Sequence, residues 1–232
     1  MFRRVTRGAA AALAVAGLAA GCSTDLGDDG ASGSGLTGSR SATAEPGRYS
    51  ALPEPCGTVD EDTLHELLPG GEPAAYEGEP TATYDTGRRV GCEWNVPQET
   101  TARRLTVDFQ RVLSYDPGIS DDDQAELDFA AMAAEAGVAL DDTATATVTQ
   151  PGEDVTAAAV DDVGHAAYLV DQPTPGDTGA GREVTVAFRS ANVIVTVTYT
   201  VATTRADDPP DSAGLQAGAR AAARQIAGGL DG

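Results

Sequence analysis

The stretch EVTVAFRSANVIVTVTYTV, Glu183–Val201, decides the fold class of this chain. Apolar side chains occupy every second position on both sides of Ser190-Ala191-Asn192. A period of two is typical of strands that bury one face, and Asn192 is a residue type that tolerates the positive φ of a tight turn. The stretch therefore predicts a β-hairpin with one buried and one polar face.

Further strand and helix patterns surround this hairpin. Strands are expected at residues 81–84, 89–95, 104–113 and 165–170, with weaker patterns at 143–149 and 155–160. Helices are expected from residue 58 to 68, from 120 to 136 and from 212 to 226, and a loop at 172–181. This order predicts an α+β fold, in which helices pack on a twisted, mostly antiparallel sheet.

Each expected helix has its own start signal or apolar stripe. Thr58 and Glu61 have the spacing of a capping box. Ser120 and the three acids after it suit the positive end of a helix dipole. Leu127, Ala130, Ala131 and Ala134 are expected to form one small-residue stripe of that helix, which Phe129 and Met132 broaden. In the last helix the expected buried residues are Leu215, Ala219, Ala222 and Ile226.

The N-terminal residues 1–21 are organised like an export signal. Arg3, Arg4 and Arg7 precede an uncharged run, Gly8–Ala20, that is too short to span a bilayer, which needs roughly 20 apolar residues. Leu18-Ala19-Ala20-Gly21-Cys22 resembles a bacterial lipoprotein cleavage box. We therefore expect Cys22 to be acylated and to anchor the chain to a lipid membrane, with an ordinary secretion site as the alternative. Arg3-Arg4 leaves twin-arginine export open as a second route.

The expected organisation has three parts. Residues 1–21 are the signal peptide, residues 22–50 are the lipidated cysteine and a flexible Gly/Ser-rich tether, and residues 51–232 are a single globular α+β domain. With Cys22 acylated, Cys56 and Cys92 remain as a pair in an oxidising compartment, which favours a structural disulfide. Their spacing is too long for a C-x-x-C redox site.

Composition excludes several functions. The formal charge is −21 and becomes −24 when the three signal-peptide arginines are removed, so nucleic acid is not an expected partner. The chain contains no lysine, which excludes a P-loop, a serine–lysine nucleophile and Schiff-base chemistry. His65 and His165 are the only histidines, and nothing in the sequence places them together. We expect no catalytic residues, no metal site and no cofactor, and hence not an enzyme.

Five arginines form the one basic concentration in this acidic chain: Arg88, Arg89, Arg103, Arg104 and Arg111. If they share one face of neighbouring strands, they make a positive site suited to a carboxylate or phosphate of an envelope component. The alternative is a set of separate surface ion pairs, each worth about 0–1 kcal/mol.

Several motifs together resemble one family. Pro55-Cys56 precedes a helix, Gly91-Cys92-Glu93-Trp94 follows it, and the Val/Thr hairpin comes late in the chain. With the cleavage box and the tether, this pattern resembles a set of secreted actinobacterial lipoproteins grouped as a domain of unknown function, over residues 53–230. The resemblance implies a compact sandwich similar to PsbP-like and envelope sensor domains, and it transfers no catalytic residues.

These observations predict a lipoprotein on the outer face of the cell membrane that binds an unknown envelope ligand or protein. The sheet face and the region from Arg88 to Arg111 are the expected contact surface. The alternative is a structural or assembly partner of another envelope protein.

Overall fold

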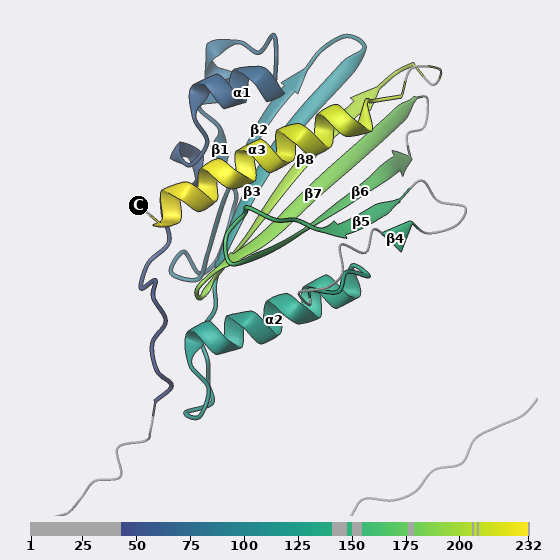
Figure 1. Cartoon of the computed structure of the whole chain (residues 1–232). Coiled ribbons are helices and arrows are strands. Elements are labelled where there is room, and N and C mark those ends of the chain that lie inside the picture. The colour runs from purple at the N-terminus through teal and green to yellow at the C-terminus, as the bar shows by residue number, and fades with distance from the viewer. Residues whose placement is uncertain are drawn as a thin grey trace, which may run out of the picture. The chain divides into compact units, whose positions relative to one another are not determined.

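The described residues form one antiparallel sheet of eight strands with three α-helices (Figure 1). The computed structural model describes residues 43–140, 148–149, 155–175, 179–205, 207 and 209–231, so the expected signal peptide, Cys22 and most of the expected tether lie outside it. The strands are β1 (Glu79–Pro80), β2 (Arg89–Pro97), β3 (Thr101–Arg111), β4 (Val148–Thr149), β5 (Thr156–Ala159), β6 (Ala166–Pro175), β7 (Ala180–Ser190) and β8 (Val193–Thr203). The α-helices are α1 (Glu61–Leu67), α2 (Asp121–Glu135) and α3 (Ser212–Asp231), and two 3-10 helices are η1 (Pro55–Gly57) and η2 (Pro73–Tyr76). The α+β expectation is confirmed.

The sheet joins two antiparallel meanders. Its strand order is β1-β2-β3-β8-β7-β6-β5-β4, so the chain leaves β3, passes through α2 to the far edge, and returns strand by strand. The last strand, β8, then pairs with β3 over its whole length, from Arg111↔Val193 to Thr101↔Thr203. The two longest pairings of the sheet therefore meet on β8, the strand whose Val/Thr alternation is clearest in the sequence.

The predicted β7–β8 hairpin is confirmed, but its turn works differently from the expectation. Ala191 takes the positive φ, at 49°, instead of Asn192. Asn192 is fully buried, where its side-chain oxygen accepts from Tyr49 N (2.9 Å) and its amide nitrogen donates to Tyr49 O (3.0 Å). Its side chain thus provides hydrogen-bond partners for the backbone of Tyr49, which is distant in sequence.

One face of the sheet, called the inner face, carries the larger core. Alternate residues of β3, β7 and β8 point to this side, among them Phe109, Phe188 and Val197. They pack beneath α1 and α3, which lie in front of the sheet in Figure 1. The expected stripe of the last helix is confirmed, since Leu215, Ala219, Ala222 and Ile226 are all buried there.

The opposite side, called the outer face, is covered by α2 over part of its area. The predicted helix is confirmed, and the Ser120 hydroxyl accepts from Asp123 N at its start. The predicted stripe is wrong: Leu127 is 57% exposed, and Ala130, Ala131 and Ala134 are exposed as well. The buried row is Ala125, Phe129 and Ala133. Small residues are distributed around the whole circumference of α2. The side of the helix that faces the sheet is therefore determined by its one aromatic ring, Phe129, and by the buried Asp121.

The folded unit begins earlier than the expected boundary at residue 51. Residues from Thr43 onward are part of it: Glu45 O accepts from Asp121 N, and Gly47 N donates to the Asp121 carboxylate at 3.1 Å. A Cβ at Gly47 would lie 2.4 Å from Cγ of Asn192, so only glycine fits this close approach. The end of the predicted tether is therefore a docked segment.

Three further expectations differ from the structure. The capping box is absent because α1 begins at Glu61 after Asp60, while the Thr58 hydroxyl donates to Pro55 O and closes η1. The expected loop at 172–181 is shorter, since β6 continues to Pro175 and β7 begins at Ala180. The expected strand at 81–84 does not form either.

The segment at 81–84, expected as a strand, pairs with β2 only just before and at its first residue. Pairing with β2 is limited to Glu79 and Pro80, plus one bond from Thr81 N to Gly91 O. A turn follows, in which the Asp85 carboxylate accepts from Gly87 N at 3.1 Å. The segment between them runs as a loop beside the sheet, and it forms one wall of the site described below.

Candidate functional site

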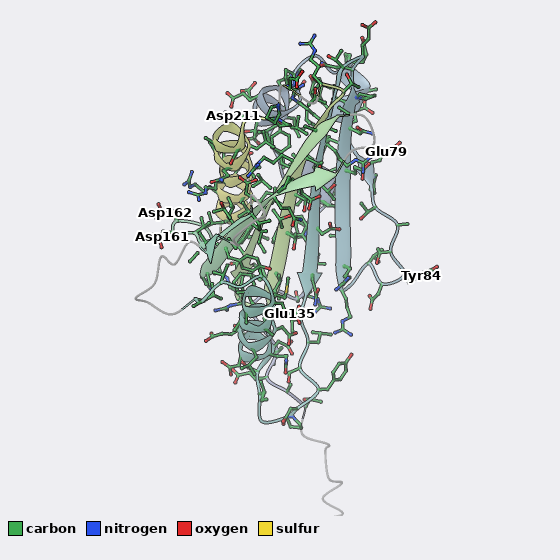
Figure 2. All side chains as sticks on the ribbon, turned by 90° about the vertical axis from the view of Figure 1, so that its right-hand side faces the viewer. Glu79, Tyr84, Glu135, Asp161, Asp162 and Asp211 are labelled. Atoms are coloured by element: carbon green, nitrogen blue, oxygen red, sulfur yellow. A yellow bond between two sulfur atoms is a disulfide. The ribbon has the colours of Figure 1, made fainter. Side chains whose placement is uncertain are left out.

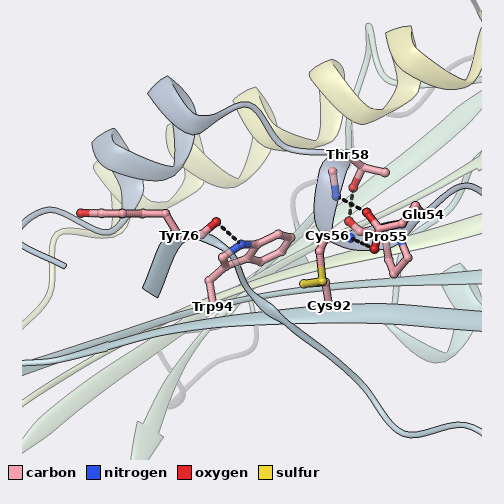
Figure 3. The surroundings of a disulfide bond; sticks show 8 residues. Glu54, Pro55, Cys56, Thr58, Tyr76, Cys92 and Trp94 are labelled. Atoms are coloured by element: carbon pink, nitrogen blue, oxygen red, sulfur yellow. Dashed lines mark hydrogen bonds between the residues drawn. A yellow bond between two sulfur atoms is a disulfide. The ribbon is translucent and has the colours of Figure 1, made fainter. Parts of the chain in front are cut away.

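The predicted disulfide between Cys56 and Cys92 is confirmed, with an S–S distance of 2.07 Å (Figure 3). It fastens η1 to β2 on the inner face. Beside it, Trp94 is buried and donates from Nε1 to Tyr76 O at 3.1 Å. A Cβ at Gly78 would lie 2.5 Å from the Cys92 sulfur. The close packing makes this region a structural staple.

The five arginines expected as one contact surface fall into two groups. Arg103 and Arg104 lie near the start of β3, whereas Arg88, Arg89 and Arg111 lie where β2 begins and β3 ends. Arg104 and Arg111 are separated by about 23 Å at the usual rise of a strand. Alternation also divides them between faces, because Arg103 lies beside Tyr199 of the inner face and Arg104 pairs with Glu93 at 3.4 Å on the outer face.

A hollowed surface, called the outer groove, lies on the outer face beside α2. Its floor is made by Asp108 and Gln110 of β3 with their cross-strand partners Thr196 and Ile194 of β8. One wall is the 81–83 segment, and the other is a row along α2. That row is Gln124, Asp128 and Met132, spaced four apart on one side of the helix.

The outer groove consists of two hollows that share Gln110. The first, of about 400 Å³, lies between the 81–83 segment and Met132 and includes Arg89 and Asp108. The second, of about 650 Å³, includes Arg88, Tyr115, Asp116 and Asp128. Both volumes fall in the range of ligand sites in proteins.

A glycine next to the first hollow lets two polar side chains approach each other. Gly91 stands opposite Asp108 in the β2–β3 pairing. A Cβ at Gly91 would lie 2.5 Å from both Asp108 Oδ1 and Thr81 Oγ1, so a carboxylate and a hydroxyl converge over a residue without a side chain. Partial burial raises the pKa of Asp108 above its usual value, and the Arg89 guanidinium acts in the opposite direction.

Arginine side chains hold the polar groups of the outer groove in place. Arg89 Nη2 donates to Gln110 Oε1 at 2.6 Å. Arg88 Nη1 donates to the Tyr115 hydroxyl at 2.7 Å, and its guanidinium carbon lies 5.7 Å from the centre of that ring. The Tyr115 side chain nevertheless stays 83% exposed. Its ring is therefore oriented by the protein and open to solvent.

One buried carboxylate fixes the loop that carries Tyr115. Asp121, at the first position of α2, is 6% exposed and accepts from Ser114 N at 2.7 Å as well as from Gly47 N. The Asp116 carboxylate accepts from Gly118 N at 2.8 Å and closes the turn after Tyr115. The second hollow therefore has a rigid margin. Of the acids proposed to start α2, Asp121 thus does more than interact with the helix dipole.

The two histidines lie in separate surroundings. His65 pairs with Glu61 at 3.5 Å and stacks on Tyr76, with 3.9 Å between ring centres. His165 Nδ1 accepts from Ala191 N at 3.2 Å, next to the β7–β8 turn. Within the described ranges, no three His, Cys, Asp or Glu side chains gather in a way that could hold a metal ion.

A third hollow, of about 440 Å³, lies on the inner-face side between η1 and the end of α3. Gln225 and Gly229 line it, and the Gln225 side-chain oxygen is buried without a hydrogen-bond partner in the described part of the chain. Glu54 also lines it, but that carboxylate accepts from Cys56 N and Gly57 N and caps η1. Its polar groups are thus mostly engaged in holding the fold.

Sequence reasoning missed most of the outer groove, including Asp108, Gln110 and Tyr115, and it also missed the exposed Tyr84 nearby. Tyr84 stands on the loop after the 81–83 wall and is fully exposed, clear of the strands in Figure 2. A usable signal was present in the sequence. Each exposed tyrosine sits between a hydroxyl residue and an aspartate, in Thr83-Tyr84-Asp85 and Ser114-Tyr115-Asp116, where a turn and not a core position is expected.

The chain matches no described protein family and no curated protein. No helix in the described ranges has both the length and the apolar character needed to cross a membrane.

Proposed function

We propose that this protein is a lipid-anchored lipoprotein on the outer face of the cell membrane that binds an envelope ligand in the outer groove. The resemblance to actinobacterial lipoproteins, with acylation of Cys22, supports the address. The all-antiparallel sheet with helices on both faces is consistent with the PsbP-like or sensor-domain sandwich that the resemblance implies.

The outer groove is the observation that carries the binding function. It has the size of a ligand site, and its charged and hydrogen-bonding side chains face open space. Most of the inner face, by contrast, is filled by packed core side chains. The exposed Tyr115 lines the second hollow of the groove, and a tyrosine ring offers a large contact area with a polar end.

The anchor is tested by mass spectrometry of the protein extracted from membranes. We expect an acylated N-terminal peptide that begins at Cys22, and release of the Cys22→Ala variant from the membrane fraction. An unmodified N-terminus upstream of Cys22, in protein from the soluble fraction, would contradict the proposed address.

Binding is tested by thermal unfolding of the full chain against a collection of envelope glycans, lipids and small molecules. A ligand present at about 100 times its Kd stabilises the folded state by about 2.7 kcal/mol. We expect Gln110→Trp, which places a ring where the two hollows meet, to abolish the shift. Ala102→Trp, on the outer face of the same strand but away from the groove, should leave it unchanged.

A collection-wide absence of shifts, together with capture of one specific envelope protein, would overturn ligand binding in favour of the assembly role.

A further inference from the structure

We infer that the outer groove takes a neutral oligosaccharide of the cell envelope. The inference rests on the proposed function and deepens it, by naming the chemical class of the ligand. Four features of the groove carry the argument: its balance of charge, its paired donors and acceptors, its exposed tyrosine ring and its open form.

The charge balance disfavours an ionic ligand. The lining carries two guanidinium groups, Arg88 and Arg89, and three carboxylates, Asp108, Asp116 and Asp128, so charges of both signs lie side by side. An anion drawn to the arginines meets these carboxylates, and a cation drawn to the carboxylates meets the arginines. The surrounding protein is strongly acidic, with a formal charge of −21, and adds to the repulsion of anions. A ligand without net charge meets neither penalty.

The hydrogen-bonding groups suit vicinal hydroxyls. Each sugar hydroxyl both donates and accepts, so it needs acceptors and donors side by side. Over Gly91 the carboxylate of Asp108 offers acceptors and the hydroxyl of Thr81 offers both functions. Next to them, Gln110 and Arg89 are already joined at 2.6 Å and present their remaining donors from a fixed position. Such prepositioned groups reduce the conformational cost of binding.

Tyr115 supplies the apolar part of the site. Sugar rings have one face of C–H groups that packs on aromatic rings, and tyrosine gives a large contact area at low entropic cost. Tyr84, Tyr115 and Leu127 are the large apolar side chains exposed among the described residues. Of these three, Tyr115 lines the second hollow, whereas Tyr84 and Leu127 line neither hollow.

The form of the outer groove fits a chain of sugars. The two hollows are open to solvent and are neighbours, because Gln110 lines both. A small metabolite is usually enclosed by its site, while a polymer must lie across an open surface. We therefore expect affinity to rise with the number of sugar units until both hollows are occupied.

The test is calorimetric titration of the purified full chain with neutral tetrasaccharides of glucose, mannose, galactose, arabinose and N-acetylglucosamine. Inorganic phosphate and oligogalacturonate are the charged probes. At least one neutral tetrasaccharide should bind, at least tenfold more tightly than its own monosaccharide and than either charged probe. Tyr115→Ala and Asp108→Asn should each weaken binding at least tenfold, whereas Tyr115→Phe should weaken it less, because the ring that makes the contact is kept.

The matched controls are Leu127→Ala, an exposed apolar truncation elsewhere, and Asp62→Asn, an exposed acid of α1. Each should change the affinity less than twofold. The inference is overturned if no neutral tetrasaccharide binds, if a charged probe binds best, or if Tyr115→Ala behaves like Leu127→Ala. In those cases a ligand of another class that is blocked by Gln110→Trp leaves the proposed function standing, and the absence of any such ligand removes both.

Discussion

The two faces of the sheet are built for different tasks. The inner face buries Trp94, Phe109 and Phe188 almost completely and is fastened by a disulfide. The outer face has a smaller core, in which Phe129 of α2 packs on Tyr168 with 5.4 Å between ring centres. Next to α2 the outer face is left open, and the open part holds the outer groove.

The difference teaches how one sheet separates stability from binding. The core on the inner face is closely packed, so a substitution that changes the volume of a side chain there lowers stability. Across the outer face, the row Thr106, Thr198 and Thr185 is only partly buried, and its side chains tolerate water. Substitutions on the inner face should therefore act on the global free energy of unfolding, and those on the outer face on local order or on ligand affinity.

The largest effect is expected at Asp171, a fully buried carboxylate of the inner face. It accepts from Arg182 at 2.5 Å, from Gln216 at 2.6 Å and from the Ser212 hydroxyl at the start of α3. Asp171→Ala should lower the free energy of unfolding by up to about 5 kcal/mol, because it removes the acceptor from a buried charge pair. Urea unfolding measures the loss.

The control for this change is Asp161→Ala, an exposed acid labelled in Figure 2, which should stay within about 0.5 kcal/mol of the parent. Equal effects of the two substitutions would show that the inner face is not the stabilising one.

The next effect is expected from the disulfide. Replacing both Cys56 and Cys92 by alanine opens a loop of 36 residues and should cost about 4 kcal/mol on the chain-entropy estimate. Urea unfolding of the parent with and without reductant should give the same difference. A loss below about 1 kcal/mol would mean that packing around Trp94 alone holds η1 on β2.

A smaller, local effect is expected on the outer face. Ser120→Ala removes the hydroxyl that accepts from Asp123 N and should cost about 1 kcal/mol, or roughly a fivefold loss of hydrogen-exchange protection in α2. Amides of α3 should keep their protection, and Leu127→Ala should leave both helices unchanged. Parallel losses in α2 and α3 would mean that the two faces open together.

The smallest effect concerns the pH dependence of stability. The folded-state pKa of Asp108 is raised by partial burial, so the folded protein binds this proton more tightly than the unfolded chain. The contribution of this carboxyl to stability is therefore favourable in acid and falls as the pH rises from the usual aspartate pKa through the raised value. Asp108→Asn should flatten the stability profile in that window, measured by urea unfolding and by NMR titration of the carboxyl. An unchanged profile would contradict the burial of this group.

Strong alternation and helical stripes were sufficient to predict the sheet class, β7 and β8, and the buried side of α3. The disulfide followed from the number of cysteines and the expected oxidising compartment. Prediction failed where small residues carry little pattern. On α2 the alanines are spread around the helix, so the stripe could not be chosen without knowing that Phe129 meets Tyr168. At Ala191 and Asn192 the choice of which residue takes positive φ depends on Tyr49, which is distant in sequence.

The candidate site could be predicted only in part. Arg88 and Arg89 were chosen because basic residues are rare in this chain, and both line the outer groove. Arg103 and Arg104 were grouped with them because they are close in sequence. The length of β3 places them far from Arg88 and Arg89, and the alternation of side chains along the strand directs the two arginines to opposite faces. Asp108 gave no signal, since its role depends on the glycine opposite it and on a loop that fails to pair as a strand.

Asp121 accepts from Gly47 N and from Ser114 N on the loop that carries Tyr115. The neighbouring Tyr49 is hydrogen-bonded to Asn192 at the β7–β8 turn and, through its hydroxyl, to Leu230 O of α3. A pull on the segment before residue 47 would therefore be shared among the margin of the outer groove, the central hairpin and the last helix.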